Sequence, residues 1–379
     1  MALVLTEEQT MLQESARDFL HSRAPASHLR DLRDRASETG FSPELWQEMS
    51  AMGWPAIVIP EAYGGLGFGY TGLGLVLQES GRTLTPSPLL ASAMMVPAAL
   101  LRSGTPEQKT ALLPRLAAGR SVATLAMDEH NQHDPQHVTT RVSRNAGGFL
   151  LNGHKRFVLD GMAADTVIVS ARGGGKPSDP GGISLFVIPG STPGIAIARC
   201  QALDTHVVAD ITLNEVQLPA SALLGAEHQG LETLEHALDA GRIGQSAELL
   251  GVALEAFERS LAYLKERQQF GVPIGSFQAL QHRAAILFAE LEMCKSLVLH
   301  ALQQLDAGTD RLAELASMTK AKVAVTAMRA TAEAIQFHGG IGMTDEFDIG
   351  FFYKRARILE TLLGDRYYHL DRYSRERGY

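Results

Sequence analysis

The chain has 379 residues, which exceeds one ordinary core and allows two or three domains or one large multilayer unit. Hydrophobic residues make up 45% and charged residues 20%, the balance of an ordinary globular protein. The formal net charge of −8 argues against nucleic acid as a partner, but not against a small anionic ligand held by a local basic cluster.

Two cysteines, Cys200 and Cys294, are too few for a disulfide framework, so the sequence predicts a protein of the reducing cytoplasm. The first residues, MALVLTEEQT, have neither a basic segment nor a long apolar stretch, which argues against a secretion signal. The longest apolar run, residues 89–101, is too short to span a bilayer and contains Pro97. We therefore expect no membrane association.

Residues 1–120 have the pattern of a helical domain. Thr6 and Gln9 have the spacing of a capping box, and the residues that follow repeat apolar side chains at helical intervals. Further short helices are expected within residues 42–54, 71–84 and 106–119, and the segment IPEAYGGLGFG separates the first two.

Residues 121–226 have a different residue pattern, in which short β-branched runs alternate with glycine, proline and asparagine. This pattern predicts a small antiparallel β domain. The expected strands lie within residues 148–161, 165–172, 182–190, 194–200 and 209–219, and the glycine-rich segment 172–182 is expected to be a surface loop between two of them.

Residues 227–379 are helical again, now in long segments. Four helices are expected within residues 230–270, 277–308, 311–339 and 351–373, and their short connections predict a four-helix bundle. The predicted fold is therefore α+β: an N-terminal helical domain (1–120), a middle antiparallel β domain (121–226) and a C-terminal four-helix bundle (227–379).

Five short motifs are more specific together than any one of them is alone. They are PEAYGGLG (60–67), GFLLNGHKRFVLDG (148–161), GRIGQSAELLG (241–251), ERQQFGVPIGSFQALQH (266–282) and AIQFHGGIGMTDE (334–346). In this order and spacing the chain resembles the acyl-CoA dehydrogenase family over nearly its whole length. The endings FGVPIGSFQALQHR and YKRARILETLLGD look most like the small-subunit branch, similar to the pimeloyl-CoA dehydrogenase small subunit.

The resemblance implies a flavoprotein of fatty acid metabolism with FAD as cofactor and α,β-oxidation of an acyl-CoA thioester as its reaction. It also implies an oligomer, either of identical chains or with a catalytic paralogue, and an electron-transfer protein as acceptor.

Arg267 ends a long predicted helix and is followed by Phe270. An arginine there forks well onto a pyrophosphate while the aromatic ring packs on a nucleotide, although a solvated cation at a helix end is the simpler interpretation of the residues alone. In the family, the residues that match Arg267, Phe270, Phe277 and Gln278 hold the FAD of the neighbouring subunit.

Gln336 and the pair Gly339–Gly340 also suggest nucleotide contact. Glycines let a backbone approach a phosphate or ribose closely, and the glutamine supplies an amide, while a glycine C-cap that ends a helix is compatible with both roles. The resemblance assigns this segment to the neighbour's FAD as well.

Asp239 and Arg242 are three residues apart and so share a helix face, where a surface ion pair is the ordinary interpretation. By resemblance they lie beside the thioester and pantetheine of the substrate.

The carboxylate base that the family reaction needs is missing from both of its usual places. Removal of a proton alpha to a thioester requires such a base opposite the flavin. By resemblance the two family positions hold Leu363 and Gly241, and neither side chain accepts a proton. Glu248 and Glu360 are the nearby acids, and solvated or structurally paired carboxylates are the simpler interpretation of both.

The flavin pocket of the middle domain is also altered. The family's threonine and serine there become Met127 and His133, and a tryptophan and threonine become Phe157 and Leu159. Phe157 still offers an aromatic face, whereas Leu159 lacks a hydroxyl for hydrogen bonding.

A second change lies before the last helix. By resemblance an Arg-Asp pair of the family becomes Lys354 and Arg355. Groups that the family lends to a neighbour's FAD are therefore kept, whereas those that serve its own flavin are mostly replaced.

Three functions remain open at this point. The chain could be a subunit that completes the FAD site of a catalytic paralogue. It could be a free-standing flavoenzyme with a relocated base or a different chemistry, such as desulfination or oxygenation. It could also be a CoA-ester-binding subunit without turnover. Bound FAD that an acyl-CoA bleaches would favour the second function, and colourless protein would favour the first or third.

Overall fold

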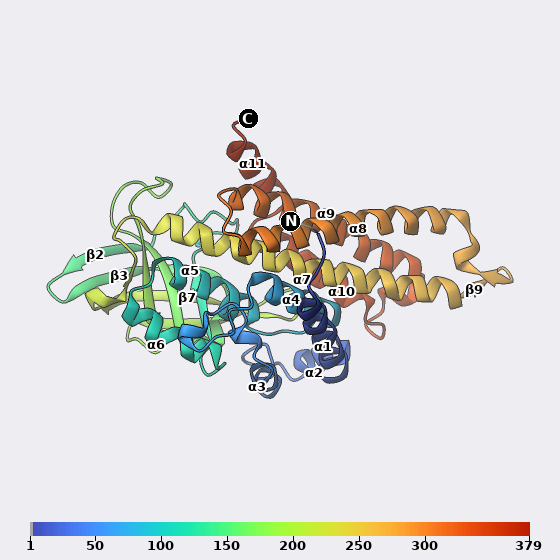
Figure 1. The fold of residues 1–379 in the computed structure, drawn as a ribbon, viewed down its shortest axis with the longest axis horizontal. Helices are drawn as coiled ribbons and strands as arrows, with labels where there is room; N and C mark the ends of the chain where they lie inside the picture. Colours follow the sequence, from blue (N-terminus) through green and yellow to red (C-terminus); the bar gives the residue numbers. More distant parts are fainter. Residues whose placement is uncertain (1–2) are drawn as a thin grey trace. The chain divides into compact units, whose positions relative to one another are not determined.

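The computed structural model describes residues 3–379 and divides them into two compact units. The first, the bundle unit, contains the described residues up to 34, residues 74–85 and residues 242–379. The second, the sheet unit, contains residues 35–73 and 86–241. Figure 1 labels the elements of both.

The bundle unit begins with helices α1 (Glu7–Arg23) and α2 (Ala26–Asp34). The predicted capping box is confirmed, since the Gln9 amide donates to the Thr6 hydroxyl at 3.2 Å and the Thr6 amide donates to the Gln9 side chain at 3.1 Å. Helix α4 (Tyr70–Thr83) supplies its residues from Gly74 onward to the same unit. The buried Glu79 on α4 accepts hydrogen bonds from Arg17 and Gln13 of α1, which ties the two helices together.

Three of the long predicted helices of the bundle are confirmed. They are α7 (Gly230–Glu266, in the bundle unit from Arg242), α8 (Gln278–Asp306) and α9 (Leu312–His338), while α10 (Ile349–Thr361) covers only part of the fourth. The short strands β9 (Gln268–Gln269) and β10 (Val272–Pro273) form a hairpin between α7 and α8, and Figure 1 shows these helices running side by side up to it. Helix α9 packs against α8, α10 and the final helix α11. We call the end that carries the hairpin the hairpin end of the bundle.

The last predicted helix is wrong in one respect, because residues 351–373 form two helices. Helix α10 ends at Thr361, and α11 (Arg366–Glu376) begins after a turn in which Leu363 has φ 58° and Gly364 has φ 104°. Both values lie in the left-handed region, which ends a right-handed helix. The Asp365 side chain then accepts a hydrogen bond from the Tyr368 amide at 2.8 Å and caps α11.

The sheet unit contains an eight-stranded sheet among the described residues. Its order is β6-β7-β3-β2-β4-β5-β8, and β1 pairs with β4. The strand bounds are β1 (Ala123–Ala126), β2 (Arg141–Asn145), β3 (Gly148–Leu159), β4 (Thr166–Arg172), β5 (Ile183–Pro189), β6 (Ile195–Gln201), β7 (Val207–Leu218) and β8 (Leu223–Leu224).

The five predicted strands are present, and most of the pairing is antiparallel. The parallel pairing of β1 with β4 was not predicted, because apolar alternation says nothing about strand direction. A core that includes Phe149, Leu151, Phe186 and Ile211 fills one side of the sheet. The predicted loop follows β4 as a glycine-rich connection to β5.

Helices complete the sheet unit. They are α3 (Pro43–Ala51), α5 (Val96–Ser103), α6 (Pro106–Ala117) and, before α5, a π-helix (Leu89–Met95). Ser42 caps α3 by accepting from the Leu45 amide, and Thr105 caps α6 through a second capping box. In the part of the chain that the structure describes, no helix combines the length and apolar character needed to cross a membrane.

Candidate functional site

The hairpin end of the bundle presents four of the predicted FAD-binding residues. Arg267 follows α7, Phe270 lies in the hairpin turn with φ 55°, and Phe277 and Gln278 begin α8. All four are exposed, and the Phe270 side chain is 92% exposed. The Phe270 and Phe277 rings stand edge to face with centroids 6.2 Å apart, and the Arg267 carbonyl accepts from the Ile274 amide at 2.8 Å.

The C-terminal end of α9 reaches the same place. The buried His338 ring lies 4.4 Å from the Tyr263 ring near the end of α7, centroid to centroid. Gln336 is exposed on the last turn of α9, and Gly339 (φ 62°) and Gly340 follow it. A β-carbon built at either glycine would have no atom within 4 Å, so the backbone there is open to a ligand.

These residues fit FAD in chemical character. An arginine, two aromatic rings, an amide and an open glycine backbone are the groups that hold a pyrophosphate, a ring and a ribose. They are exposed at the hairpin end of the bundle.

The turn from Glu360 to Gly364, which we call the 360–364 turn, contains Leu363, the residue that the resemblance matches to the first family position of the base. Leu363 there is 1% exposed, and its carbonyl accepts from Arg242 Nε at 3.3 Å and from His369 Nε2 at 3.1 Å. Lys320 Nζ of α9 donates at 3.0 Å to the carbonyls of Glu360 and Gly364. Hydrogen-bond donors thus hold the backbone of this turn while its central side chain is apolar.

Burial has a large effect on Lys320. Its ammonium group is fully buried, and this burial, helped by the positive charge of Arg242, outweighs the opposing effect of Glu360 and lowers the pKa of Lys320 to about 7. Neither Lys320 nor His369 was predicted as a site residue, since only the tertiary fold brings α9 and α11 to the turn. Lys320 lies within an alanine-rich helix, where an isolated lysine gives no signal of its role.

Both acids weighed as replacement bases are paired in the structure. Glu248 on α7 accepts from Arg355 Nε at 2.8 Å, and this ion pair is buried. Glu360 accepts from Arg357 Nη1 at 2.8 Å, one turn earlier on α10. Arg355, which the resemblance matched to an acid of the family, therefore has a structural partner in Glu248. Gly241, the second family position, is buried in α7.

The remaining predicted residues lie in the sheet unit. Asp239 is buried on α7, three residues before Arg242. Phe157 has φ 52° in a bulge of β3, its ring is 41% exposed, and the Arg156 guanidinium lies 4.8 Å above it. Met127 is buried, and Leu159 offers only its carbonyl, which accepts from the Thr124 hydroxyl at 2.6 Å. The exposed aromatic face is retained, but the side-chain hydroxyls are absent.

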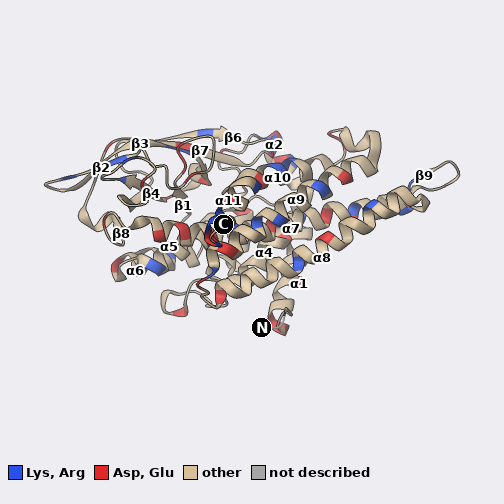
Figure 2. Ribbon diagram, turned by 90° about the horizontal axis from the view of Figure 1, so that it is seen from above, with Lys and Arg blue, Asp and Glu red and all other residues tan. Residues whose placement is uncertain are grey.

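His133 Nδ1 donates to Asp128 Oδ2 at 2.9 Å, so the ring is engaged within its own loop. Across residues 3–379, no group of three or more histidine, cysteine, aspartate or glutamate side chains is arranged to hold a metal ion. Figure 2 shows that acidic and basic residues are interspersed along α8, as expected for a solvated helix.

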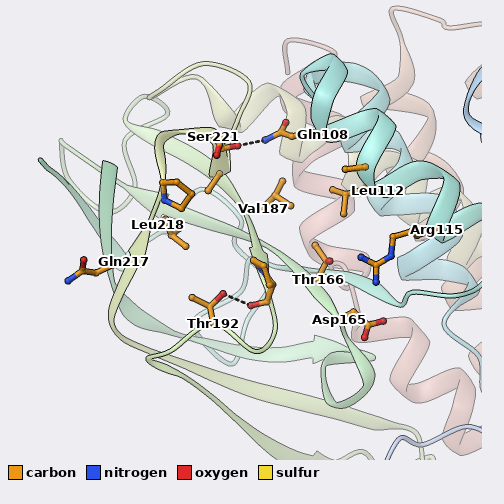
Figure 3. A pocket seen from close by; sticks show the side chains of 14 residues that line it. Gln108, Leu112, Arg115, Asp165, Thr166, Val187, Thr192, Gln217, Leu218 and Ser221 are labelled. Carbon is orange, nitrogen blue, oxygen red and sulfur yellow. Dashed lines mark hydrogen bonds between the residues drawn. The ribbon is translucent and has the colours of Figure 1, made fainter. Parts of the chain in front are cut away.

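A cavity of about 430 Å³ lies elsewhere in the sheet unit, between α6 and the sheet edge (Figure 3). Arg115 and Leu112 of α6 face Asp165, Thr166 and Val187 across it. None of the predicted site residues lines this cavity, and its carboxylate, Asp165, accepts a hydrogen bond from the Val122 amide at 2.8 Å.

Comparison with known proteins supports the predicted family. Family models match over most of the chain: acyl-CoA dehydrogenase N-terminal domain (residues 6–120), middle domain (123–217) and C-terminal domain (228–376). The probable acyl-CoA dehydrogenase YngJ of Bacillus subtilis is 33% identical over 367 residues, which cover 95% of each chain.

Two solved structures are similar over nearly the whole chain. The Tcur3481–Tcur3483 steroid ACAD is 30% identical with a TM-score of 0.87 and covers 97% of each chain. A glutaryl-CoA dehydrogenase of Mycobacterium smegmatis in complex with FADH2 is 26% identical with a TM-score of 0.87 and covers 99% of this chain and 95% of its own. The predicted fold class is therefore confirmed, and the chain belongs to the acyl-CoA dehydrogenase family.

Proposed function

We propose that this chain is a flavin-binding subunit of an acyl-CoA dehydrogenase complex, which completes the FAD site of a catalytic paralogue and oxidises acyl-CoA poorly by itself. The observation that carries the proposal is Leu363. The 360–364 turn is held by three donors, yet the side chain at the family's base position is apolar and buried. The other family position holds Gly241.

The two acids nearest in sequence do not offer an easy replacement. Glu248 is held by Arg355 in a buried ion pair, and releasing it as a base would leave an unpaired buried cation. Glu360 is held by Arg357. Either carboxylate would have to give up its ion pair before it could take a proton from a substrate.

The hairpin end supports the subunit role. FAD, when bound, would supply the acceptor for the hydride that leaves the β-carbon of an acyl-CoA. Arg267 would hold the pyrophosphate, Phe270 and Phe277 would offer aromatic faces, and Gln336 with Gly339 would contact the remaining nucleotide. Because these groups are exposed, they suit FAD that another chain also holds. The related steroid ACAD is described by a pair of protein names, Tcur3481–Tcur3483, which suits an assembly of two kinds of chain.

The test compares the purified chain alone with the chain mixed with a paralogue that carries the family's glutamate. We expect the chain alone to reduce added FAD with acyl-CoA at least a hundredfold more slowly than the mixture, since a positioned base contributes about 10²–10⁴-fold. An electron-transfer protein would serve as the final acceptor. Rapid bleaching of FAD by the chain alone would contradict the proposal and favour a free-standing enzyme with a relocated base. CoA-ester binding without activity in either sample would favour a non-catalytic binding subunit.

A further inference from the structure

Gln245 on α7 is a fully buried residue whose side chain lacks the hydrogen bonds that burial demands. Its exposed fraction is 0%, and among the described residues neither Oε1 nor Nε2 has a hydrogen-bond partner. Most buried side-chain amides are satisfied, because an unpaired buried polar group destabilises the fold. The neighbouring Ser246 shows the ordinary situation, since its hydroxyl donates to the Arg242 carbonyl at 2.6 Å.

Helix geometry places Gln245 beside the 360–364 turn. Side chains rotate by about 100° per residue along a helix, so Gln245 lies between Arg242 and Glu248 both along α7 and around it. Arg242 contacts the Leu363 carbonyl and the Tyr368 hydroxyl, the latter at 3.1 Å, and Glu248 contacts Arg355 of α10. The face of α7 that carries Gln245 is therefore the face that packs against α10, α11 and the turn between them.

The polar groups around this face are engaged with one another. Lys320 donates to two carbonyls of the turn, His369 donates to the Leu363 carbonyl, and Glu248 holds Arg355. None of these contacts reaches the Gln245 amide. An amide carries donors on Nε2 and an acceptor on Oε1, so a group that satisfies it has to offer an oxygen or a polar hydrogen.

We propose that Gln245 is a specificity-determining residue that binds an oxygen atom on the acyl chain of a CoA thioester. The inference rests on the proposed membership of an acyl-CoA dehydrogenase complex, and it adds that this chain itself binds an acyl-CoA beside the 360–364 turn. A hydroxyl group on the acyl chain would accept from Nε2 or donate to Oε1, whereas a plain alkyl chain would leave both atoms unpaired. Sites built to bond a substrate hydroxyl discriminate strongly against the analogue that lacks it.

The experiment measures binding of matched CoA thioesters to the full chain by calorimetry. The ligands are butanoyl-, hexanoyl- and octanoyl-CoA and their counterparts with a hydroxyl at the third carbon or at the chain end. The proteins are the unmodified chain, Gln245→Met and Gln303→Met. Methionine keeps the length of glutamine without its polar atoms. Gln303 is a matched control because it is a buried glutamine on α8 whose Nε2 donates to the Val4 carbonyl.

We expect at least one hydroxylated ester to bind the unmodified chain about tenfold or more tightly than its saturated partner. Gln245→Met should abolish or reverse that preference, and Gln303→Met should keep it. In the absence of any ester, Gln245→Met should also raise the midpoint of thermal unfolding, because it removes two unpaired buried atoms.

Other results would overturn the inference in distinguishable ways. Saturated and hydroxylated esters that bind equally, or a preference that survives Gln245→Met, would show that the amide does not contact the acyl chain. A lower unfolding midpoint for Gln245→Met would show that the amide is satisfied within the folded protein, for instance by an ordered water. If no ester binds any of the three proteins, the inference fails, whereas the proposed role at the FAD site of a paralogue is tested separately by the activity of the mixture.

Discussion

Leu363 combines an uncommon backbone conformation with a side chain that cannot accept a proton. A non-glycine residue at φ 58° is uncommon, and here donors from α7, α9 and α11 hold the surrounding carbonyls. The backbone of the turn is thus specified by contacts that do not depend on which side chain stands at 363. Placing a carboxylate at this position is therefore a fair test of the proposed lack of a base.

The first prediction is that Leu363→Glu raises the rate at which the FAD-loaded chain oxidises a saturated acyl-CoA by a factor of about 10² or more, because a positioned base supplies about 10²–10⁴-fold. Stopped-flow bleaching of the flavin absorbance measures the rate. Leu362→Glu, which adds the same charge one residue earlier, should give no such gain. Equal rates for both variants and the unmodified chain would show that the missing base is not what limits the reaction.

The second prediction concerns Arg267. Its side chain is exposed at the hairpin end, so Arg267→Ala should leave folding nearly unchanged while it weakens FAD retention in the assembled oligomer. Loss of a charge-assisted hydrogen bond costs about 1.5–3 kcal/mol, which corresponds to about a 10- to 150-fold faster loss or weaker binding of FAD. Lys265→Ala removes a nearby exposed cation and is the control. FAD retention that is the same in both variants would make Arg267 an ordinary helix-end cation.

The third prediction concerns acid stability and the buried ion pair between Glu129 and Lys155 in the sheet unit. Burial alone would raise the pKa of Glu129, but the Lys155 ammonium at 2.6 Å and hydrogen bonds from Thr139 and Thr140 outweigh it and lower the pKa to about 2. The unfolded chain binds this proton first as the pH falls, with a pKa of about 4.3. The stabilisation is therefore present above about pH 4.3 and is lost as the pH approaches 2.

Glu129→Gln should flatten this acid dependence and, at neutral pH, destabilise the fold by about 3–5 kcal/mol, because Lys155 is left as an unpaired buried cation. Urea unfolding at several pH values measures both effects. Glu227→Gln is the control, since Glu227 pairs with the mostly exposed Arg144 and should change stability little. An unchanged pH dependence in Glu129→Gln would contradict the assignment.

At the residue level, the sequence pointed to individual candidate residues better than it predicted which helices and side chains surround them. Arg267, Phe270 and Gly339 were predicted from short motifs, and the structure brings them to one end of the bundle. Lys320 and Gln245 gave no usable signal, because their roles depend on which helices surround them. The pairing of Glu248 with Arg355 joins residues 107 positions apart, which local spacing cannot reveal.

At the level of elements, α4 and α7 cross at a glycine contact. A β-carbon built at Gly251 would lie 1.8 Å from the Gln78 carbonyl oxygen, and one at Gly81 would lie 2.0 Å from the Glu248 carbonyl oxygen. Contacts of this length with backbone atoms cannot be relieved by a side-chain rotation. The two helices therefore touch backbone to backbone, which only glycine permits.

The fourth prediction follows from that crossing. Gly251→Ala should destabilise the fold by about 1–3 kcal/mol or more, because the added methyl group forces the helices apart. Gly350→Ala on α10 is a matched control, since its β-carbon would meet no atom within 4 Å, and it should stabilise by up to about 1 kcal/mol through helix propensity. Denaturant unfolding distinguishes the opposite signs. A stabilising Gly251→Ala would show that α4 does not approach α7 this closely.

Helices and strands were largely predictable because their periodic patterns and caps are local, as the Thr6–Gln9 box shows. The break between α10 and α11 was missed, although the Gly364–Asp365 pair is a signal of a helix end followed by a cap. Apolar periodicity that continues across residues 351–373 outweighed that signal. The parallel β1–β4 pairing was unpredictable for another reason, since it joins segments about 40 residues apart.

At the level of the whole molecule, α8 carries several large apolar side chains that are exposed in this chain. Ile286 is 47% exposed, Phe288 is 57% exposed and Met293 is 54% exposed. Apolar residues gathered on one element in this way mark an association surface. Together with the exposed nucleotide-binding residues at the hairpin end, they suit a chain that works beside another.

The fifth prediction is that the protein forms at least a dimer, and that two such dimers associate as a dimer of dimers. Sedimentation velocity at micromolar concentration measures the state. Phe288→Asp should shift the distribution toward smaller species, whereas Lys295→Asp, a polar change on the same helix, should not. A stable monomer of the unmodified protein at that concentration would contradict the prediction.

The predicted domain boundaries at residues 120 and 226 follow the change from helical to strand-like residue patterns and back, and they remain predictions. The compact units are not contiguous, since the bundle unit draws on residues before 35, on 74–85 and on 242–379. Composition along a sequence reports what each segment becomes. It does not report which distant segment completes its core.

Because the bundle unit is discontinuous in sequence, its parts are synthesised on the ribosome well before they can pack together. Helices α1, α2 and most of α4 leave the exit tunnel long before their packing partners, which begin at residue 242. At about 5–20 residues per second, the nascent chain waits many seconds with Leu75, Val76 and Leu77 uncovered. The N-terminal segment would therefore need a chaperone or transient collapse during translation, and a chain released before α7 is complete would be a target for proteases.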